Sequence, residues 1–263
     1  MNEWSEETVY LITNVTSILF CVVFGILLLD MRDYRRFIRR APVFPLRYVM
    51  ARRTLGIAYL VIGGLMAYQV ITGQSTKQDE FLPFVGLIIS SSQAMLFTGA
   101  LLALYNSRLL RRETIWTNII PVGLFLVVYA AFFNQQEVQL VVRKVFFAFY
   151  IIQLMAYTIV FFMERAKYLD QIEEYFDEGK NFDLYSNRGV TALFLCSLAI
   201  GVAALASYFF TELWQFSVFI AFYTLYYIII AFYFLRYAWR SQKIKDVTTP
   251  EEWSKTEKYK KEL

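Results

Sequence analysis

The polar side chains that could do chemistry within the long apolar segments of this chain are few. Ser90–Gln93 reads SSSQ near the middle of one segment, and Gln153 lies at a similar depth in another. Hydroxyl and amide groups in a membrane usually bond across helices, which contributes about 0.6–2 kcal/mol each. Interhelical packing is therefore the first interpretation. The functional alternative is a small polar pocket for a neutral or amphipathic ligand, lined by Ser91, Gln93 and Gln153.

A second candidate is the adjacent basic pair Arg143 and Lys144, which stands apart from the other basic residues of the chain. Long basic side chains near a membrane boundary commonly extend to the lipid headgroups, and this is the first interpretation of the pair. The functional alternative is that Arg143 and Lys144 together bind an anionic ligand.

Several classes of chemistry are excluded by residue type. The chain has no histidine, and its two cysteines, Cys21 and Cys196, are far apart in the sequence. No carboxylate lies within an apolar segment, so the usual ligands of zinc, copper, haem or a di-iron centre are missing. Phosphate-binding glycine loops and nucleophile motifs are absent too. We expect no enzyme activity, no metal and no cofactor.

The elements that must position these residues are membrane-spanning helices. Hydrophobic residues make up 58% of the chain and aromatic residues 19%. The apolar residues form long uncharged blocks of about 17–25 residues, the length a helix needs to cross a bilayer. We therefore predict an all-α polytopic transmembrane bundle of about seven spans. The predicted spans are 8–29, 54–72, 81–105, 115–133, 145–163, 190–210 and 213–235. The basic pair Arg143 and Lys144 cuts off the outer end of the fifth span, so six spans remain an alternative.

Small residues favour close helix packing in two of these spans. The segment GIAYLVIGG places Gly56, Gly63 and Gly64 in the second span, and CSLAIGVAALAS lies in the sixth. Glycine allows two helix backbones to approach closely in a membrane.

The distribution of basic residues predicts the orientation of the bundle. All of the 26 Lys and Arg residues except Lys77, Arg143 and Lys144 fall in alternate loops and in the C-terminal tail. Basic loops remain in the cytoplasm, so the N-terminus is expected outside and the C-terminus inside. The arginines are expected to contact anionic lipid headgroups rather than nucleic acid, since each contributes about 1 kcal/mol near such a surface.

Helical periodicity continues beyond the fifth span and beyond the seventh. After Met163, apolar side chains at helical spacing include Tyr168, Ile172 and Phe176, so this helix is predicted to extend into the cytoplasm to a point near Gly179. The tail, residues 240–263, carries a capping box followed by Trp253 and predicts a further short amphipathic helix. A helix of that length is marginal in water and needs a partner. The expected contacts to an output partner are Tyr168, Ile172, Phe176 and Trp253.

Six segments together resemble a known family. They are TSILFCVVFGILLL, ARRTLGIAYLVIGG, SSSQAMLFTGALLALYN, LDQIEEYFDEG, AIGVAALAS and FYTLYYI. They are similar to the membrane-embedded N-terminal sensor region of bacterial AraC-type transcription regulators, whose C-terminal domain is a helix-turn-helix. The resemblance implies a sensor in the cytoplasmic (inner) membrane that controls a DNA-binding domain. No helix-turn-helix segment occurs in the printed residues, so no direct nucleic-acid binding is expected from them.

The sequence thus predicts a receptor-like sensor, with a seven-helix bundle over residues 1–239 that relays a signal to a cytoplasmic output. The expected partners are the lipid bilayer and either a cytoplasmic protein or a DNA-binding domain not present in this chain, with a homodimer as a further candidate. Two alternatives stay open, a transporter of a small neutral solute and a membrane scaffold for a cytoplasmic partner.

Overall fold

The structure, a computed structural model, describes residues 5–30, 46–73, 81–106, 112–132, 135–175 and 188–241. All regular secondary structure in these ranges is α-helical, which confirms the predicted all-α class for this part of the chain. The helices are α1 (Glu6–Asp30), α3 (Leu46–Gly73), α4 (Phe81–Tyr105), α5 (Arg112–Ala131), α6 (Gln136–Tyr175), α8 (Arg188–Ser207) and α9 (Leu213–Ser241).

Six of these helices, α1, α3, α4, α6, α8 and α9, are long and apolar enough to cross a membrane. The predicted span 115–133 corresponds to α5, in which the apolar helix Ile119–Tyr129 is shorter. The predicted span 145–163 lies within α6, the longest helix at 40 residues. By length and composition, six of the described helices could therefore cross a membrane, and the seventh span stays a prediction.

Several helices continue well past the predicted spans. The α3 helix begins at Leu46 rather than Thr54, and α9 continues to Ser241. Hydropathy marks only the part of a helix that lies in hydrocarbon, whereas Arg, Gln and Glu are good helix formers in the polar layer beyond it. The predicted continuation of the fifth helix is confirmed as far as Tyr175.

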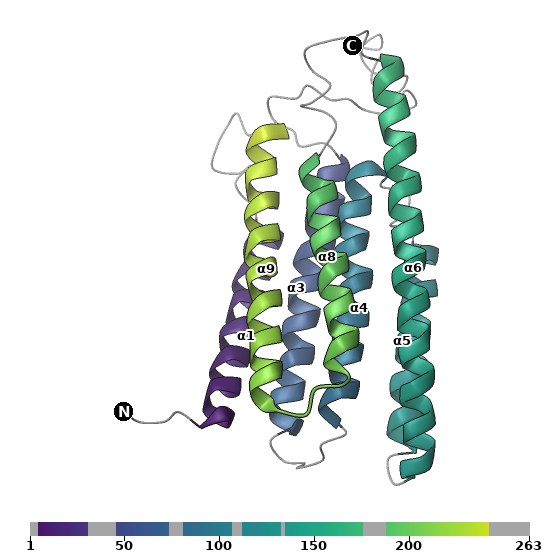
Figure 1. The fold of residues 1–263 in the computed structure, drawn as a ribbon. Helices are drawn as coiled ribbons and strands as arrows, with labels where there is room; N and C mark the ends of the chain where they lie inside the picture. The colour runs from purple at the N-terminus through teal and green to yellow at the C-terminus, as the bar shows by residue number, and fades with distance from the viewer. Residues whose placement is uncertain are drawn as a thin grey trace.

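Five helices form a closed ring, and two more pack against one side of it. Each of α1, α3, α4, α8 and α9 contacts the next in that order, and α9 contacts α1 to close the ring. The α6 helix packs on α4 and α8, whereas α5 packs on α4 and α6. Figure 1 shows α5 and α6 beside the ring, with α6 extending beyond its neighbours. As a result, α4 belongs to both groups and joins them.

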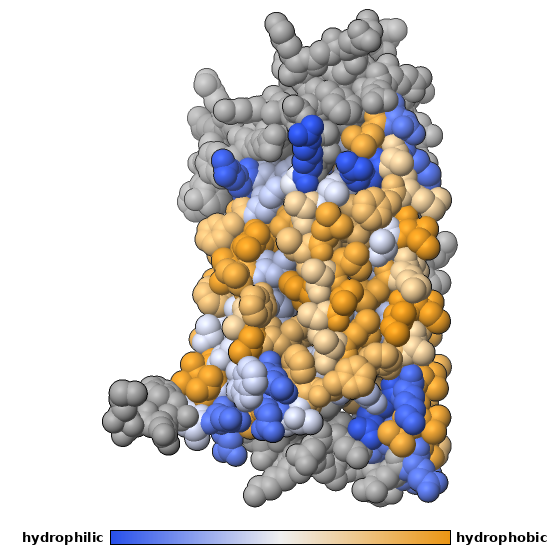
Figure 2. Space-filling view, in the orientation of Figure 1, coloured by the Kyte–Doolittle hydropathy of each residue, from blue (hydrophilic) through white to orange (hydrophobic). Residues whose placement is uncertain are grey.

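Charge divides the two ends of the bundle. We call one the basic end, because it holds most of the described arginines: Arg47, Arg52, Arg53, Arg165, Arg188 and Arg236. The opposite end carries acidic side chains that include Glu6, Glu7, Glu137 and Glu212. A broad apolar band separates hydrophilic side chains at the two ends in Figure 2. This band has the character of a surface that faces lipid.

The backbones of α1 and α3 approach each other closely within the ring. A Cβ atom added to Gly25 would lie 3.2 Å from the Gly56 carbonyl oxygen, and one added to Gly56 would lie 3.2 Å from the Gly25 carbonyl oxygen. At Gly63 an added Cβ would lie 3.1 Å from the Cys21 Cβ. Gly56 and Gly63 therefore permit the predicted close approach. Gly64 does not contribute, since an added Cβ there meets nothing within 4 Å.

Aromatic side chains fill the ring. Phe97 of α4 stacks on Tyr227 of α9 with ring centroids 5.1 Å apart, and Tyr59 of α3 meets both rings edge-on. All three side chains are fully buried. Aromatic pairs in these geometries contribute about 0.5–1.5 kcal/mol beyond their buried area. They hold three helices of the ring together at its centre.

Candidate functional site

The polar residues singled out in the sequence meet across α4 and α6 at the middle of the apolar band. Ser91 Oγ donates a hydrogen bond to Gln153 Oε1 at 2.6 Å. Gln153 Nε2 in turn donates to the Ser91 carbonyl oxygen at 3.4 Å and to the Tyr157 hydroxyl oxygen at 3.2 Å. Ser91 and Gln153 are both buried. The Gln153 amide and the Ser91 hydroxyl are thus hydrogen-bonded to each other across the two helices, as the packing interpretation requires.

Gln93 belongs to a different contact. Its Oε1 accepts a hydrogen bond from the Tyr227 hydroxyl at 3.0 Å, inside the ring. Because helix residues rotate by about 100° each, Ser91 and Gln93 lie on nearly opposite faces of α4. The structure therefore brings Ser91 and Gln153 together but does not place Gln93 in the same pocket.

A small polar gap lies beside Gln93 between α4, α6 and α8. It is lined by Ser90, Gln93, Ala94, Tyr150, Ser197, Ile200 and Gly201, and it has no room for a water molecule. The Tyr150 hydroxyl donates to the Gly201 carbonyl oxygen at 3.3 Å across this gap. In the sequence, Ser197 and Gly201 stand out only as small residues of the segment CSLAIGVAALAS. Nothing there singles out Tyr150, because one tyrosine among 19 carries no distinguishing signal.

Two further tyrosines of α3 bond the backbone of α9, which the sequence did not indicate. The Tyr48 hydroxyl donates to the Phe234 carbonyl oxygen at 2.9 Å. The Tyr59 hydroxyl donates to the Tyr227 carbonyl oxygen. Both phenols are buried, and a carbonyl in a helix retains a second lone pair that can accept such a bond. The residues Gln93, Tyr227 and Tyr59 thus form one chain of bonds from α4 through α9 to α3.

At the opposite end, Arg143 and Lys144 face different surroundings. The Arg143 side chain is buried with 6% of its surface exposed, whereas Lys144 is exposed. Arg143 packs within the protein rather than extending to the headgroups as first interpreted. The two side chains do not converge, so the idea that they bind one anionic ligand together has no support from their placement.

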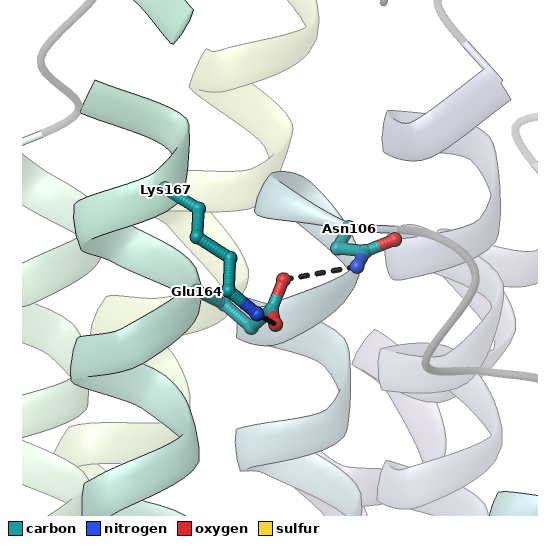
Figure 3. Close-up of polar contacts among 3 residues, drawn as sticks. All are labelled: Asn106, Glu164 and Lys167. Carbon is teal, nitrogen blue, oxygen red and sulfur yellow. Dashed lines mark hydrogen bonds and ion pairs between the residues drawn. The ribbon is translucent and has the colours of Figure 1, made fainter. Parts of the chain in front are cut away.

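At the basic end, a polar junction joins the end of α4 to α6. Asn106 Nδ2 donates to Glu164 Oε2 at 2.9 Å, and Lys167 Nζ binds Glu164 Oε1 at 2.8 Å (Figure 3). The Glu164 side chain is 12% exposed and that of Lys167 is 60% exposed. The Glu164 carboxylate therefore accepts a hydrogen bond from an amide of α4 and forms an ion pair with an ammonium group in the next turn of its own helix.

Two other contacts at this level tie α6 to the ring. The Tyr105 and Tyr168 rings pack with centroids 5.1 Å apart, which joins α4 to α6. Arg165 Nε donates to Thr191 Oγ1 at 2.9 Å, which joins α6 to α8. We define the basic-end junction as these contacts together with the Asn106–Glu164 bond. The part of α6 beyond the junction, up to Tyr175, leaves the bundle from here.

The predicted output residues divide between described and undescribed parts of the chain. Tyr168 is half-buried against Tyr105, so it contributes to the junction. Ile172 lies in the extension of α6, and its side chain falls outside the described residues, as do Phe176 and Trp253. Their contact with an output partner stays a prediction.

The contacts that this arrangement makes are hydrogen bonds between helices and an ion pair within α6. Within the described residues, no group of three or more His, Cys, Asp or Glu side chains could hold a metal ion. Comparison of the chain with protein-family profiles, with curated proteins and with solved structures found no match. The function has to be argued from the geometry of α4 and α6.

Proposed function

We propose that this protein is an integral membrane sensor whose helix bundle relays a signal along α6 to a cytoplasmic output. The observation that carries this proposal is the double attachment of one long helix. Through Ser91 and Gln153, α4 holds the middle of α6, and through Asn106 and Glu164 it holds α6 again near the end of the apolar band.

Such an attachment supports signal relay because α6 is a single continuous helix between the two contacts. A change at Gln153 that rotates or shifts α6 must also alter the geometry at Glu164, since the helical backbone between them is hydrogen-bonded throughout. The mechanism we propose is a population shift between two packings of α6 on α4, biased by a ligand that prefers one of them.

The basic end is assigned to the cytoplasm in this proposal, and the membrane to the cytoplasmic (inner) membrane. The arginines at that end support the orientation through the positive-inside rule. The output is either a cytoplasmic protein or a C-terminal DNA-binding domain of the kind that the AraC-type resemblance implies, contacted through the extension of α6 and the tail. Transcription regulation is the expected result in the second case.

A spin-label experiment tests the relay. Labels are attached to cysteines introduced at Asp170, in the α6 extension, and at Arg53, at the basic end of α3, in a chain with Cys21→Ala and Cys196→Ala. The distance distribution is then measured by double electron–electron resonance in lipid nanodiscs. We expect Gln153→Leu, which removes the bond to Ser91, to change the distribution at the basic end although the substitution lies several turns away.

The matched control is Ile152→Ala on the same helix. Ile152 is 65% exposed on the lipid-facing surface and should leave the distance distribution unchanged. If Gln153→Leu and Ile152→Ala both leave it unchanged in folded protein, the two attachments are not coupled and the relay proposal is wrong.

The polar gap beside Gln93 supports a second candidate, a carrier of a small neutral solute. Its lining of hydroxyl and amide groups suits an uncharged polar molecule, provided that a second packing opens the gap. Vesicles that contain only this protein should then take up glycerol or urea faster than empty vesicles. Uptake that Gln93→Leu abolishes would favour the carrier over the sensor.

A further inference from the structure

Arg165 of α6 and Arg188 of α8 both lie at the basic end, where these two helices pack on each other. Arg165 of α6 donates its Nε hydrogen bond to Thr191 of α8 at 2.9 Å. Arg188, the first residue of α8, precedes Thr191 by three positions and so lies on the same helix face. Cβ atoms three residues apart on a helix are about 5–6 Å apart. The guanidinium groups of Arg165 and Arg188 therefore have access to the same volume.

None of the carboxylates in the described part of the chain neutralises the charge of Arg165. Its neighbours one turn away on α6 are Phe161, Phe162, Tyr168 and Leu169, and none of them is acidic. The adjacent carboxylate, Glu164, is bound by Lys167 and Asn106 instead. Among the residues that the structure describes, Arg165 has no carboxylate partner.

The bond to Thr191 leaves the two terminal nitrogens of Arg165 available as donors. Those nitrogens form the planar fork that binds phosphate through two parallel hydrogen bonds. Because Thr191 fixes the position of Nε, the fork is oriented before a ligand arrives. Such orientation lowers the entropy that is lost on binding.

The depth of these residues matches the phosphate layer of a bilayer. The apolar run of α6 ends at Met163, two residues before Arg165, and that of α8 begins just after Arg188. Hydrophilic side chains border the apolar band at both ends in Figure 2. The N-terminus of α8 adds partial positive charge at the same place.

We propose that Arg165, Arg188 and Thr191 form a binding site for a phosphate group. Arg165 and Arg188 bind the phosphate oxygens, and Thr191 positions Arg165. The phosphate is carried by an anionic phospholipid of the adjacent leaflet or by a soluble phosphate compound. This site does not depend on the sensor proposal, because it requires only that α6 and α8 pack as described.

Binding is measured by isothermal titration of the full chain in a neutral detergent. The titrants are dihexanoyl phosphatidylglycerol, dihexanoylglycerol, which lacks the phosphate, and inorganic phosphate. We expect phosphatidylglycerol to bind at least tenfold more tightly than dihexanoylglycerol. If inorganic phosphate binds as tightly as the phospholipid, the source is a soluble compound. If it binds much more weakly, the source is the lipid.

Variants locate the site. Arg165→Gln with Arg188→Gln should weaken phosphatidylglycerol binding at least tenfold. The control, Arg53→Gln with Arg236→Gln, removes the same charge from exposed positions at the same end of the bundle, and it should weaken binding less than twofold. Equal losses in the two double variants would mean that the surface charge as a whole attracts the lipid, and the proposal would be wrong.

Thr191→Val keeps the charge and shape of the site and removes only the hydroxyl group. We expect it to weaken binding about threefold or more, because Arg165 loses its fixed orientation. If the double arginine variant fails to fold, Thr191→Val still tests whether the proposed phosphate site exists. Unchanged binding in folded Thr191→Val would overturn the role of Thr191 and, with it, the proposed site.

Discussion

Asn106 at the end of α4 and Glu164 on α6 are joined by a hydrogen bond of 2.9 Å at the point where α6 leaves the bundle. The carboxylate is largely buried on the side of Asn106, although its second oxygen is paired with the exposed Lys167. A hydrogen bond to a charged group contributes more than one between neutral groups, about 1.5–3 kcal/mol. An exposed ion pair contributes about 0–1 kcal/mol. The amide is therefore the stronger of the two partners of Glu164.

This difference predicts the effects of two substitutions. Asn106→Ala should lower the free energy of unfolding by about 1–2 kcal/mol, since Glu164 loses the partner that comes from α4. Lys167→Ala should lower it by no more than about 0.5 kcal/mol, because that pair is exposed and lies within one helix. Unfolding by sodium dodecyl sulfate in mixed micelles, followed by circular dichroism, measures both. A larger loss from Lys167→Ala would contradict this ranking.

The contact between Ser91 and Gln153 predicts energetic coupling. In a double-mutant cycle with Ser91→Ala and Gln153→Ala, we expect a coupling free energy of about 0.6–1.7 kcal/mol, the range of hydrogen bonds between membrane helices. Gln93 supplies the control, because it lies on the same helix but bonds Tyr227. The cycle of Gln93→Ala with Gln153→Ala should be additive within about 0.5 kcal/mol.

The outcome of these cycles also separates packing from a shared pocket. If Gln93 and Gln153 couple as strongly as Ser91 and Gln153, the three side chains act as one site, contrary to their placement on different faces of α4. Coupling of Ser91 with Gln153 alone would agree with the two separate contacts in the structure.

Because α1 and α3 approach closely at Gly56, adding a methyl group there should lower the free energy of unfolding. Gly56→Ala should destabilise the protein, because its Cβ would lie 2.8 Å from Leu29 Cγ and 3.2 Å from the Gly25 carbonyl oxygen. Gly64→Ala is the matched control on the same helix, since it gains the same helix propensity and meets no atom within 4 Å. We expect the free energies of unfolding of the two variants to differ by about 1–3 kcal/mol. Equal stability would mean that α1 and α3 separate easily at this crossing.

The predictable part of this protein is the part that the bilayer dictates. Uncharged blocks must be helical because hydrocarbon offers no partner for backbone polar groups, and the helices therefore followed from composition. Their starting points did not follow, since α3 begins at Leu46 and α6 at Gln136, among polar residues that hydropathy does not register.

The candidate site was predictable in its residue types but not in its pairing. Ser91, Gln93 and Gln153 are conspicuous because polar residues are rare in apolar segments. Which of them meet depends on the rotation and height of α4 against α6 and α9, and a single sequence carries no signal for either quantity. The same limit explains Asn106 and Glu164. Both look like ordinary loop-flanking residues until the helix ends are placed side by side.

The orientation of the bundle is the prediction on which the cytoplasmic output depends. Single cysteines are introduced in a chain with Cys21→Ala and Cys196→Ala, at Ser5 and Glu212 at one end and at Lys167 and Arg236 at the other. All four positions are exposed. A membrane-impermeant maleimide should label the first two in intact bacterial cells and the last two only after permeabilisation, because basic ends remain in the cytoplasm. Labelling of Lys167→Cys in intact cells would show that the bundle has the opposite orientation. The α6 extension would then lie outside, where it could not reach a cytoplasmic partner.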